Sequence, residues 1–421
     1  MRFLTCCLTS CALAYPTMVL ADGIKPIIDT RLRYEHVDQT GTARKANALT
    51  FRGRAGVEVT KGPFSLLGEA EGTLALDNSY FSGLNTKTTY PIVADPQTVE
   101  INRIQVQYKG LPKTVVTLGR QRINLDDQRF VGSVAWRQNE QTFDAVRVEW
   151  SGIKNLKFDA TYSWANRTIW GSDGRDNGFT QRPQAINGDN IFVNAAYKTP
   201  IGLLTGFYYR VDEDETNVTL RRNSSDSYGG RFAGTRPLNK TVKWNYIVSF
   251  AHQKANKTNP LAYSADYWLV EGGLDIAALK LGAGAEHLGS DTSVRVKTTG
   301  LPFAGGFAFQ TPFATLHKFQ GWADKVLTTP AQGITDYYAS AGYVWKAVGP
   351  FASLTATAAY HRFDSDVANI HYGDEINLQL VAKLKKYTLL AKYADYQRKG
   401  AASFAGDADT KKLWLSVEWA L

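Results

Sequence analysis

In the stretch IDTRLRYE, residues 28–35, every second side chain is charged, and the positions between are uncharged and mostly apolar. Ile28, Leu32 and Tyr34 fall on one phase of this alternation, and Arg31 and Arg33 fall on the other. A period of two is typical of a β-strand with one apolar and one polar face. Because the polar face carries several charges, it has to lie against water.

The same alternation recurs along the rest of the chain. We count about eighteen such runs, each near the ~9–11 residues of a tilted membrane-spanning strand. Two runs are weaker than the others: the fourth, where Arg103 breaks the phase, and the tenth, near Gly229 and Gly230. The expected starts are Gly23, Ala48, Phe64, Thr98, Thr114, Thr142, Leu156, Asn190, Gly202, Ser224, Val242, Tyr263, Leu279, Thr335, Pro350, Glu375, Tyr387 and Lys411.

The lengths of the connections alternate as well. Short breaks follow even-numbered runs, as at residues 61–63, 110–112, 151–153, 199–200, 347–349 and 385–386. Longer polar segments follow odd-numbered runs, at residues 77–97, 123–141, 166–189, 212–223, 289–333 and 399–409. Short periplasmic turns and long outer loops characterise bacterial outer-membrane barrels, whereas a secreted β-sandwich has no reason to sort its loops in this way.

The sequence therefore predicts an all-β fold, a transmembrane antiparallel up-and-down β-barrel of about eighteen strands, as one domain over residues 22–421. The last run ends at Trp419 and Leu421, so a closing strand at the C-terminus would leave no free sheet edge. We expect this barrel in the outer membrane of a Gram-negative type cell. Its expected partners are outer-membrane lipid, lipopolysaccharide and the barrel assembly machinery.

The first residues read as an export signal. Arg2 precedes a largely apolar run that ends at Ala21, which predicts a signal peptide over residues 1–21. A lipoprotein signal with cleavage before Cys11 is the competing interpretation. All three cysteines lie in this segment, so the mature chain would have no thiol, no disulfide and no cysteine metal site.

Composition narrows the function. Without Arg2 the chain has 47 basic and 39 acidic residues, a bias too diffuse for a nucleic-acid-binding protein. Neither the Gly-x-Ser-x-Gly nor the His-Glu-x-x-His pattern occurs, so we expect no enzymatic activity, and we expect no cofactor and no metal site. No run after Leu20 is long and apolar enough for a transmembrane helix.

Arginines recur on the polar phase and around one strand–loop–strand unit, GRQRINLDDQRFVGSVAWRQNEQTFDAVR, residues 119–147. Rings of arginine and lysine are how pores select anions, so a cationic path through the lumen is one interpretation. The other is that the charges pair into ladders across neighbouring strands and only stiffen the wall. The expected path comprises Arg31, Arg33, Arg52, Arg54, Arg103, Arg120, Arg122, Arg129, Arg137 and Arg147, oriented by Asp126, Asp127 and Asp144.

Two blocks of sequence resemble the alginate export family of outer-membrane proteins. The first comprises GRQ at 119–121, DDQRFVGS at 126–133, WRQN at 136–139 and TFDAVRV at 142–148. The second is TPFATLHKFQGWADKVLTTPAQG at 311–333. The resemblance implies a monomeric barrel of eighteen strands with a constriction lined by arginine and lysine, through which a polyuronate passes outward. A general or substrate-specific uptake porin for small organic anions is the alternative.

The second block lies in the longest outer loop. It contains His317, Lys318, Trp322 and Asp324, which either fold inward as a gate or pack over the rim. The acidic run at residues 212–215 is either a solvated loop or a site for cations that bridge lipopolysaccharide.

Overall fold

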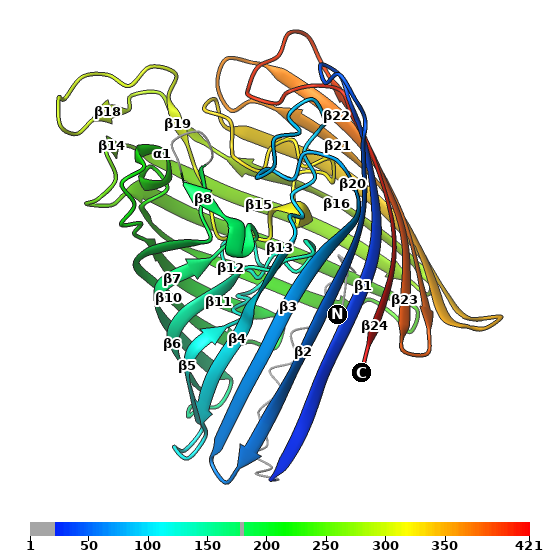
Figure 1. Ribbon diagram of the computed structural model, residues 1–421. Helices are drawn as coiled ribbons and strands as arrows, with labels where there is room; N and C mark the ends of the chain where they lie inside the picture. Colours follow the sequence, from blue (N-terminus) through cyan, green and yellow to red (C-terminus); the bar gives the residue numbers. More distant parts are fainter. Residues whose placement is uncertain (1–21, 177–180) are drawn as a thin grey trace.

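The structure, a computed structural model, describes residues 22–176 and 181–421 as a closed antiparallel barrel of eighteen strands (Figure 1). The predicted fold class is confirmed. The expected signal peptide lies outside the described residues. The barrel strands are β1 (Gly23–Gln39), β2 (Ala46–Lys61), β3 (Phe64–Ser79), β4 (Thr98–Tyr108), β5 (Thr114–Gln121), β6 (Thr142–Trp150), β7 (Leu156–Arg167), β10 (Ala185–Lys198), β11 (Leu203–Val211), β12 (Ser225–Pro237), β13 (Val242–Ala255), β15 (Ser264–Ile276), β16 (Leu279–Leu288), β20 (Ile334–Val348), β21 (Phe351–Asp364), β22 (His371–Leu384), β23 (Tyr387–Arg398) and β24 (Thr410–Ala420).

The first and last strands close the barrel. β24 pairs with β1 from Asp29 opposite Ala420 to Gln39 opposite Thr410, and the Leu421 amide donates to the Ile28 carbonyl at 2.9 Å. Every barrel strand therefore has two neighbours, and the sheet has no open edge.

Strand starts agree with the periodicity to within five residues. The largest difference is in β10, which begins at Ala185 instead of Asn190. A register shift between Asn187 and Asn190 interrupts the alternation there, so the period-two pattern is visible only beyond it. The phase break at Arg103 has a similar cause, because the β3–β4 register shifts opposite it.

The two faces of the wall differ as the alternation requires. Apolar residues such as Phe51, Leu118 and Leu378 are exposed on the outward phase, while Arg31 and Arg52 on the inward phase are almost fully buried. On the outward phase, carboxylates occur near the outer ends of the strands, each within five residues of the end. We call these residues the outer polar belt: Asp144, Asp189, Asp226, Asp266, Asp374 and Asp395.

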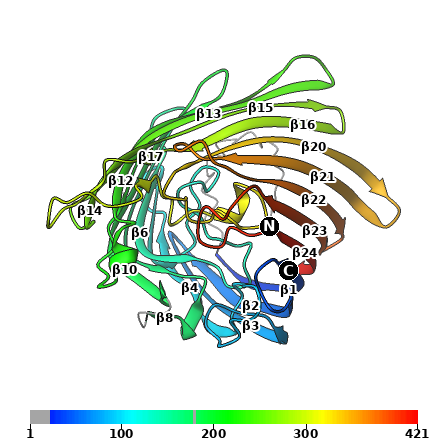
Figure 2. The same cartoon turned by 90° about the horizontal axis from the view of Figure 1, so that it is seen from above.

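Two outer loops fold back into the barrel (Figure 2). Loop L3, residues 122–141, joins β5 to β6, and loop L7, residues 289–333, joins β16 to β20. L7 contains the helical turn η2 (Leu316–Lys318). The remaining small elements also lie in outer loops: η1 (Gly171–Asp173), β8 (Arg175–Asp176), β9 (Gln181–Arg182), α1 (Val218–Arg221), β14 (Leu261–Ala262), β17 (Ser290–Asp291), β18 (Arg295–Val296) and β19 (Phe307–Ala308).

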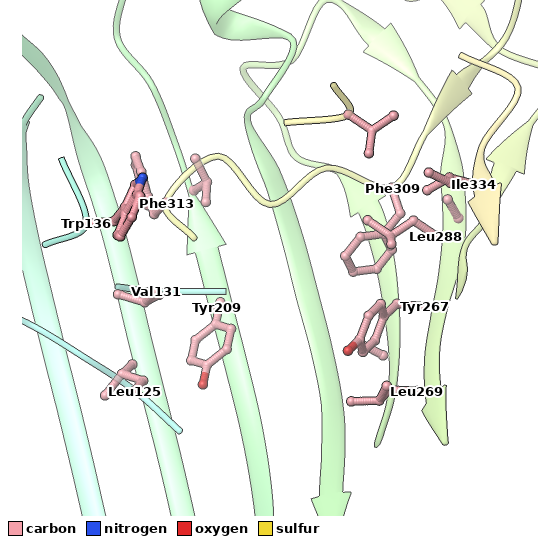
Figure 3. Packing of buried hydrophobic residues seen from close by; sticks show 14 of the residues in the cluster. Leu125, Val131, Trp136, Tyr209, Tyr267, Leu269, Leu288, Phe309, Phe313 and Ile334 are labelled. Carbon is pink, nitrogen blue, oxygen red and sulfur yellow. The ribbon is translucent and has the colours of Figure 1, made fainter. Parts of the chain in front are cut away.

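The main hydrophobic core lies inside the barrel, between these loops and the wall (Figure 3). From L3 it includes Leu125 and Val131, and from L7 it includes Phe309 and Phe313. The facing strands contribute further aromatic rings, including Phe143, which makes an edge contact with Phe313 at 5.7 Å between centroids. Removing apolar surface from water stabilises the folded state by about 25 cal/mol per Å². The contacts of this core therefore hold both loops in the lumen. No helix in the described part of the chain is long and apolar enough to cross a membrane.

The orientation of the wall can be tested on two adjacent residues of β21. Ala356 lies on the outward phase and Thr357 lies on the inward phase, where it lines the lumen. Ala356→Arg places a charge in hydrocarbon and is expected to cost about 2–4 kcal/mol of unfolding free energy, and Thr357→Arg is expected to cost less. Urea unfolding in lipid vesicles measures both, and the reverse order would contradict the assigned phase.

Candidate functional site

A cavity of about 1050 Å³ occupies the lumen between the inserted loops and the periplasmic turns. Its ceiling comes from L3 and L7, including Gln128, Lys318 and Phe319, and its lower rim includes the turn at residues 199–202. The lining contains eight lysines and arginines beside nine aspartates and glutamates. The net cationic bore that the sequence led us to expect is therefore absent from this cavity, whose lining is balanced in charge.

The arginines of β1 hold L3 in place. Arg31 donates from Nε to Gln138 Oε1 at 2.8 Å, and its other nitrogens donate to the carbonyls of Ala135 and Arg137. Arg33 stacks on the Trp136 ring, with its guanidinium carbon 4.2 Å from the centroid. These two side chains bind the backbone and a ring of L3, so they position the loop within the lumen.

The arginines of β2 lie beside carboxylates. Arg52 forms ion pairs with Asp29 and with Glu418, the latter at 3.0 Å. Arg54 forms an ion pair with Glu71 and lies 3.4 Å from Glu140 at the end of L3. The β2 side chains therefore connect the closing strand, β3 and L3.

Glu140 is the point where several of these interactions meet. Arg122 Nε donates to both of its carboxylate oxygens, at 2.9 and 3.0 Å, and Asn102 Nδ2 donates to Oε1 at 2.7 Å. Burial favours a higher pKa for Glu140, but Arg54 and Arg122 outweigh it and hold the pKa at about 2. The carboxylate thus stays charged and fixes the end of L3 to the wall.

The remaining arginines of the inward phase also have acidic partners. Arg103 makes a two-pronged contact with Glu69, at 2.8 and 2.6 Å, and Arg147 makes one with Asp159, at 2.9 and 2.5 Å. In L3, Arg129 Nε donates to Glu286 Oε1 on β16 at 2.6 Å. The planar guanidinium matches two carboxylate oxygens, which makes these pairs geometrically specific.

The four residues singled out in L7 lie inside the barrel. Asp324 accepts hydrogen bonds from Arg137 of L3 at 2.9 Å and from Lys412 of β24 at 3.0 Å. His317 Nδ1 lies 2.7 Å from Asp324 Oδ1, and its Nε2 lies 2.7 Å from Lys392 Nζ. Burial lowers the pKa of His317 well below its usual range, so the imidazole is neutral and Nε2 accepts from the lysine.

Aromatic rings enclose that lysine. Lys392 Nζ lies 3.8 Å from the centroid of Trp322 in L7 and 4.4 Å from that of Trp136 in L3. The indole of Trp136 stacks on His317 with the rings 4.1 Å apart. A desolvated ammonium over aromatic faces gains about 2 kcal/mol or more. L3 and L7 are thereby joined to each other and to β23.

Arg120 of the expected path and Asp144, one of the expected orienting acids, face the other way. Arg120 shares its phase with the exposed Leu118, and it pairs across the sheet with Asp144. Both side chains therefore lie on the outer face of the wall instead of in the lumen. Its charge led us to expect Arg120 in the lumen. Arg120 nevertheless falls on the apolar phase of β5, together with Leu118, and this phase faces outward.

Asp126 and Asp127 line the cavity but do not orient the arginines of L3 through ion pairs. Asp126 accepts from Asn194 Nδ2 at 2.9 Å, and Asp127 lies 3.4 Å from Arg231 on β12. Among the described residues, the acids that pair with the L3 arginines are Glu35, Glu140, Glu286 and Asp324. Glu286 lies on the inward phase of β16, and from this the sequence could predict that it faces the lumen. Its pairing with Arg129, a loop residue 157 positions away, leaves no pattern in the sequence.

Glu140→Gln tests whether this network holds L3. Removing one partner of a buried ion pair costs about 3–5 kcal/mol, so we expect a loss of that order in unfolding free energy at neutral pH. Because the pKa is lower in the folded state, the stabilisation is present above about pH 4.5 and is lost as the pH falls towards 2. The difference between variant and wild type should therefore shrink in acid. The matched control is Glu149→Gln, a more exposed ion-paired carboxylate, which should cost about 1 kcal/mol or less.

Three solved structures with the same fold are distant in sequence. Acinetobacter baumannii OccAB2 has a TM-score of 0.69 at 15% identity, with 94% of this chain and 98% of that chain covered. Pseudomonas aeruginosa OccK9 (OpdG) has a TM-score of 0.68 at 16% identity, with the same coverage. Acinetobacter baumannii OccAB3 has a TM-score of 0.66 at 17% identity, covering 94% and 99%. At these identities the likeness shows the barrel fold alone.

No curated protein sequence matches the chain. A sequence family described as Alginate export matches residues 64–282, which is more than half of the chain and extends from β3 into β16. With its closed eighteen-stranded wall and its lumen narrowed by L3 and L7, the chain has a porin-like fold and belongs to the alginate export family.

Proposed function

We propose that this channel passes small solutes that carry a carboxylate, with uronate monomers and short oligomers as the largest, and that it selects them by contact instead of by net charge. The observation that carries the proposal is the filled lumen. L3 and L7 leave a cavity of about 1050 Å³, comparable to the upper range of small-molecule sites.

The cations that reach this cavity support a carboxylate ligand. Arg122 is 30% exposed beside the paired Glu140, and Lys318 extends from the ceiling, where it donates to the Asp127 carbonyl at 2.5 Å. Phe319 lies beside Lys318 and offers an apolar ring to the face of a sugar. The outer edge of the Arg122 guanidinium, whose Nε and one terminal nitrogen are held by Glu140, together with the Lys318 ammonium and the Phe319 ring, matches a uronate.

The balanced lining determines the type of selectivity. With eight basic and nine acidic residues, the cavity has no single-sign field that would exclude cations. A carboxylate is favoured where it reaches Arg122 and Lys318. The protein therefore combines weak selectivity between simple ions with preference for particular carboxylate solutes.

Outward passage of a polyuronate is the second candidate, and the family to which the chain belongs favours it. A polymer needs a continuous wide path, so L3 and L7 would have to leave the lumen together, with loss of their hydrophobic core and of the contacts around Lys392. The filled lumen therefore favours small solutes. Deleting the gene separates the two: loss of secreted polysaccharide supports export, and loss of growth on a uronate supports uptake.

Liposome swelling tests the contact residues. We expect vesicles with the wild-type protein to admit a uronate monomer at least about threefold faster than the uncharged sugar of the same size, because a charge-assisted hydrogen bond is worth about 1.5 kcal/mol or more. The double variant Arg122→Gln, Lys318→Gln should lose this difference. In planar bilayers its reversal potential should also shift towards cations, because six basic residues would face nine acidic ones.

Arg362→Gln serves as the control, because this exposed arginine of β21 lies on the outer face of the wall and should change neither readout. Equal rates for the acid and the neutral sugar in the wild type would contradict the proposal, as would a strong wild-type preference for cations.

A further inference from the structure

The wall has a notch at its outer edge, because β5 and β6 extend less far outward than β4. β4 continues to Thr98, but its pairing with β5 stops at Ile104 opposite Arg120. The segment around η1 closes the notch from above, where the Ser172 amide donates to Thr98 Oγ1 at 3.0 Å (Figure 1). Below that segment, Arg120 Nη1 donates to the Ile101 carbonyl at 2.8 Å and replaces the missing strand as its partner.

Two arginines converge on one carboxylate at this notch. Arg120 Nε donates to Asp144 Oδ1 at 2.8 Å, and Arg167 Nε, at the end of β7, donates to Asp144 Oδ2 at 2.9 Å. All three residues lie on the outward phase of their strands, as the pairing of Asp144 with Arg120 and of Thr142 with Arg167 requires. The group therefore has a net charge of +1 on the membrane side of the wall.

This excess distinguishes the group from the rest of the outer polar belt in the described residues. Asp226 pairs with Arg210 alone, Asp395 pairs with Lys411 alone, and Asp189 accepts only from a tyrosine hydroxyl. Elsewhere on the belt each carboxylate thus has at most one arginine or lysine. Near the membrane interface, where the belt lies, a surplus cation costs about 0–1 kcal/mol, and it becomes favourable where an anion lies opposite it.

Arg167 has hydrogen-bond donors that the group does not use. Among the described residues its Nε is satisfied by Asp144, and no acceptor is recorded for its two terminal nitrogens. Its side chain is 27% exposed on the outward face. A planar fork of donors with one free edge matches the oxygens of a phosphate, to which arginine binds in a two-pronged manner.

We propose that Arg120 and Arg167 form a site for a phosphate group of the lipid in the outer leaflet, on the outside of the wall below the notch. The lipid that fits is a phosphorylated glycolipid, because its phosphates lie at the level of the outer polar belt. Asp144 holds both guanidinium groups in position, and the bound phosphate neutralises their surplus charge. The site is independent of what the channel transports.

Native mass spectrometry of the detergent-purified barrel with bisphosphorylated lipid A tests the proposal. We expect the wild type to retain one lipid A that Arg167→Gln loses, with about tenfold weaker binding in a titration, because one charge-assisted contact is removed. Arg167→Lys keeps the charge without the fork and should bind with intermediate affinity. The matched control is Arg362→Gln, an outward arginine on β21 that pairs only with Asp364 and is 52% exposed, and it should bind as the wild type does.

Further arms identify the ligand. Lipid A without phosphate should not bind at this site, and inorganic phosphate alone should compete only weakly, because the acyl chains supply much of the affinity. Equal retention of lipid A by Arg167→Gln and by the wild type would overturn the proposal, as would equal binding of the phosphate-free lipid. Among the described residues Arg167 forms an ion pair with Asp144 alone. The thermal unfolding of each variant without lipid verifies that it is folded.

Discussion

A closed wall of eighteen strands encloses more space than the side chains of its inner face can fill. This constraint underlies the rest of the structure, because charged side chains that point into such a lumen need water or partners. The chain meets it with two long outer loops that fold inward. L3 and L7 supply a hydrophobic core, and carboxylates and backbone carbonyls of L3 bind several arginines of the wall.

The arginines therefore act first as structural anchors. Arg31 binds the backbone of L3, Arg54 and Arg122 hold Glu140 at its end, and Arg137 joins L3 to Asp324 of L7. Of the two interpretations that the sequence left open, structural pairing describes these residues better, but several of the pairs join an inserted loop to the wall or to the other loop instead of joining neighbouring strands. What remains for a solute is a smaller set of cations at the ceiling of the cavity, and selection there depends on contact geometry more than on a field.

Much of the architecture could be predicted from the sequence, because burial on one face of a strand imposes a period of two and the position of a strand in the barrel fixes the length of its loops. The number of barrel strands follows from the count of alternating runs. The phase of β1 and β2 follows from residues such as Arg31 and Arg52, whose charges exclude them from lipid. Arg120 shows the limit of this reasoning. It is an arginine on the lipid side, tolerated because Asp144 and the Ile101 carbonyl lie beside it.

The partners within the site were harder to predict. Glu286 and Arg129 meet only because L3 crosses the lumen, and the enclosure of Lys392 by Trp136 and Trp322 brings together a strand and two loops. Periodicity describes each strand separately and contains no information on where a loop lies. The inward position of His317 and Asp324 likewise depends on tertiary packing, and the sequence offered it only as one of two alternatives.

The most direct test of this account is the entry of neutral polymers of graded size into the open channel, measured as the fall in single-channel current in planar bilayers. If L3 and L7 fill the lumen, only polymers small enough for a cavity of about 1050 Å³ will reduce the current, whichever side they are added to. Entry of polymers as wide as a fully open eighteen-stranded barrel would show that the loops do not remain inside, and would contradict the account.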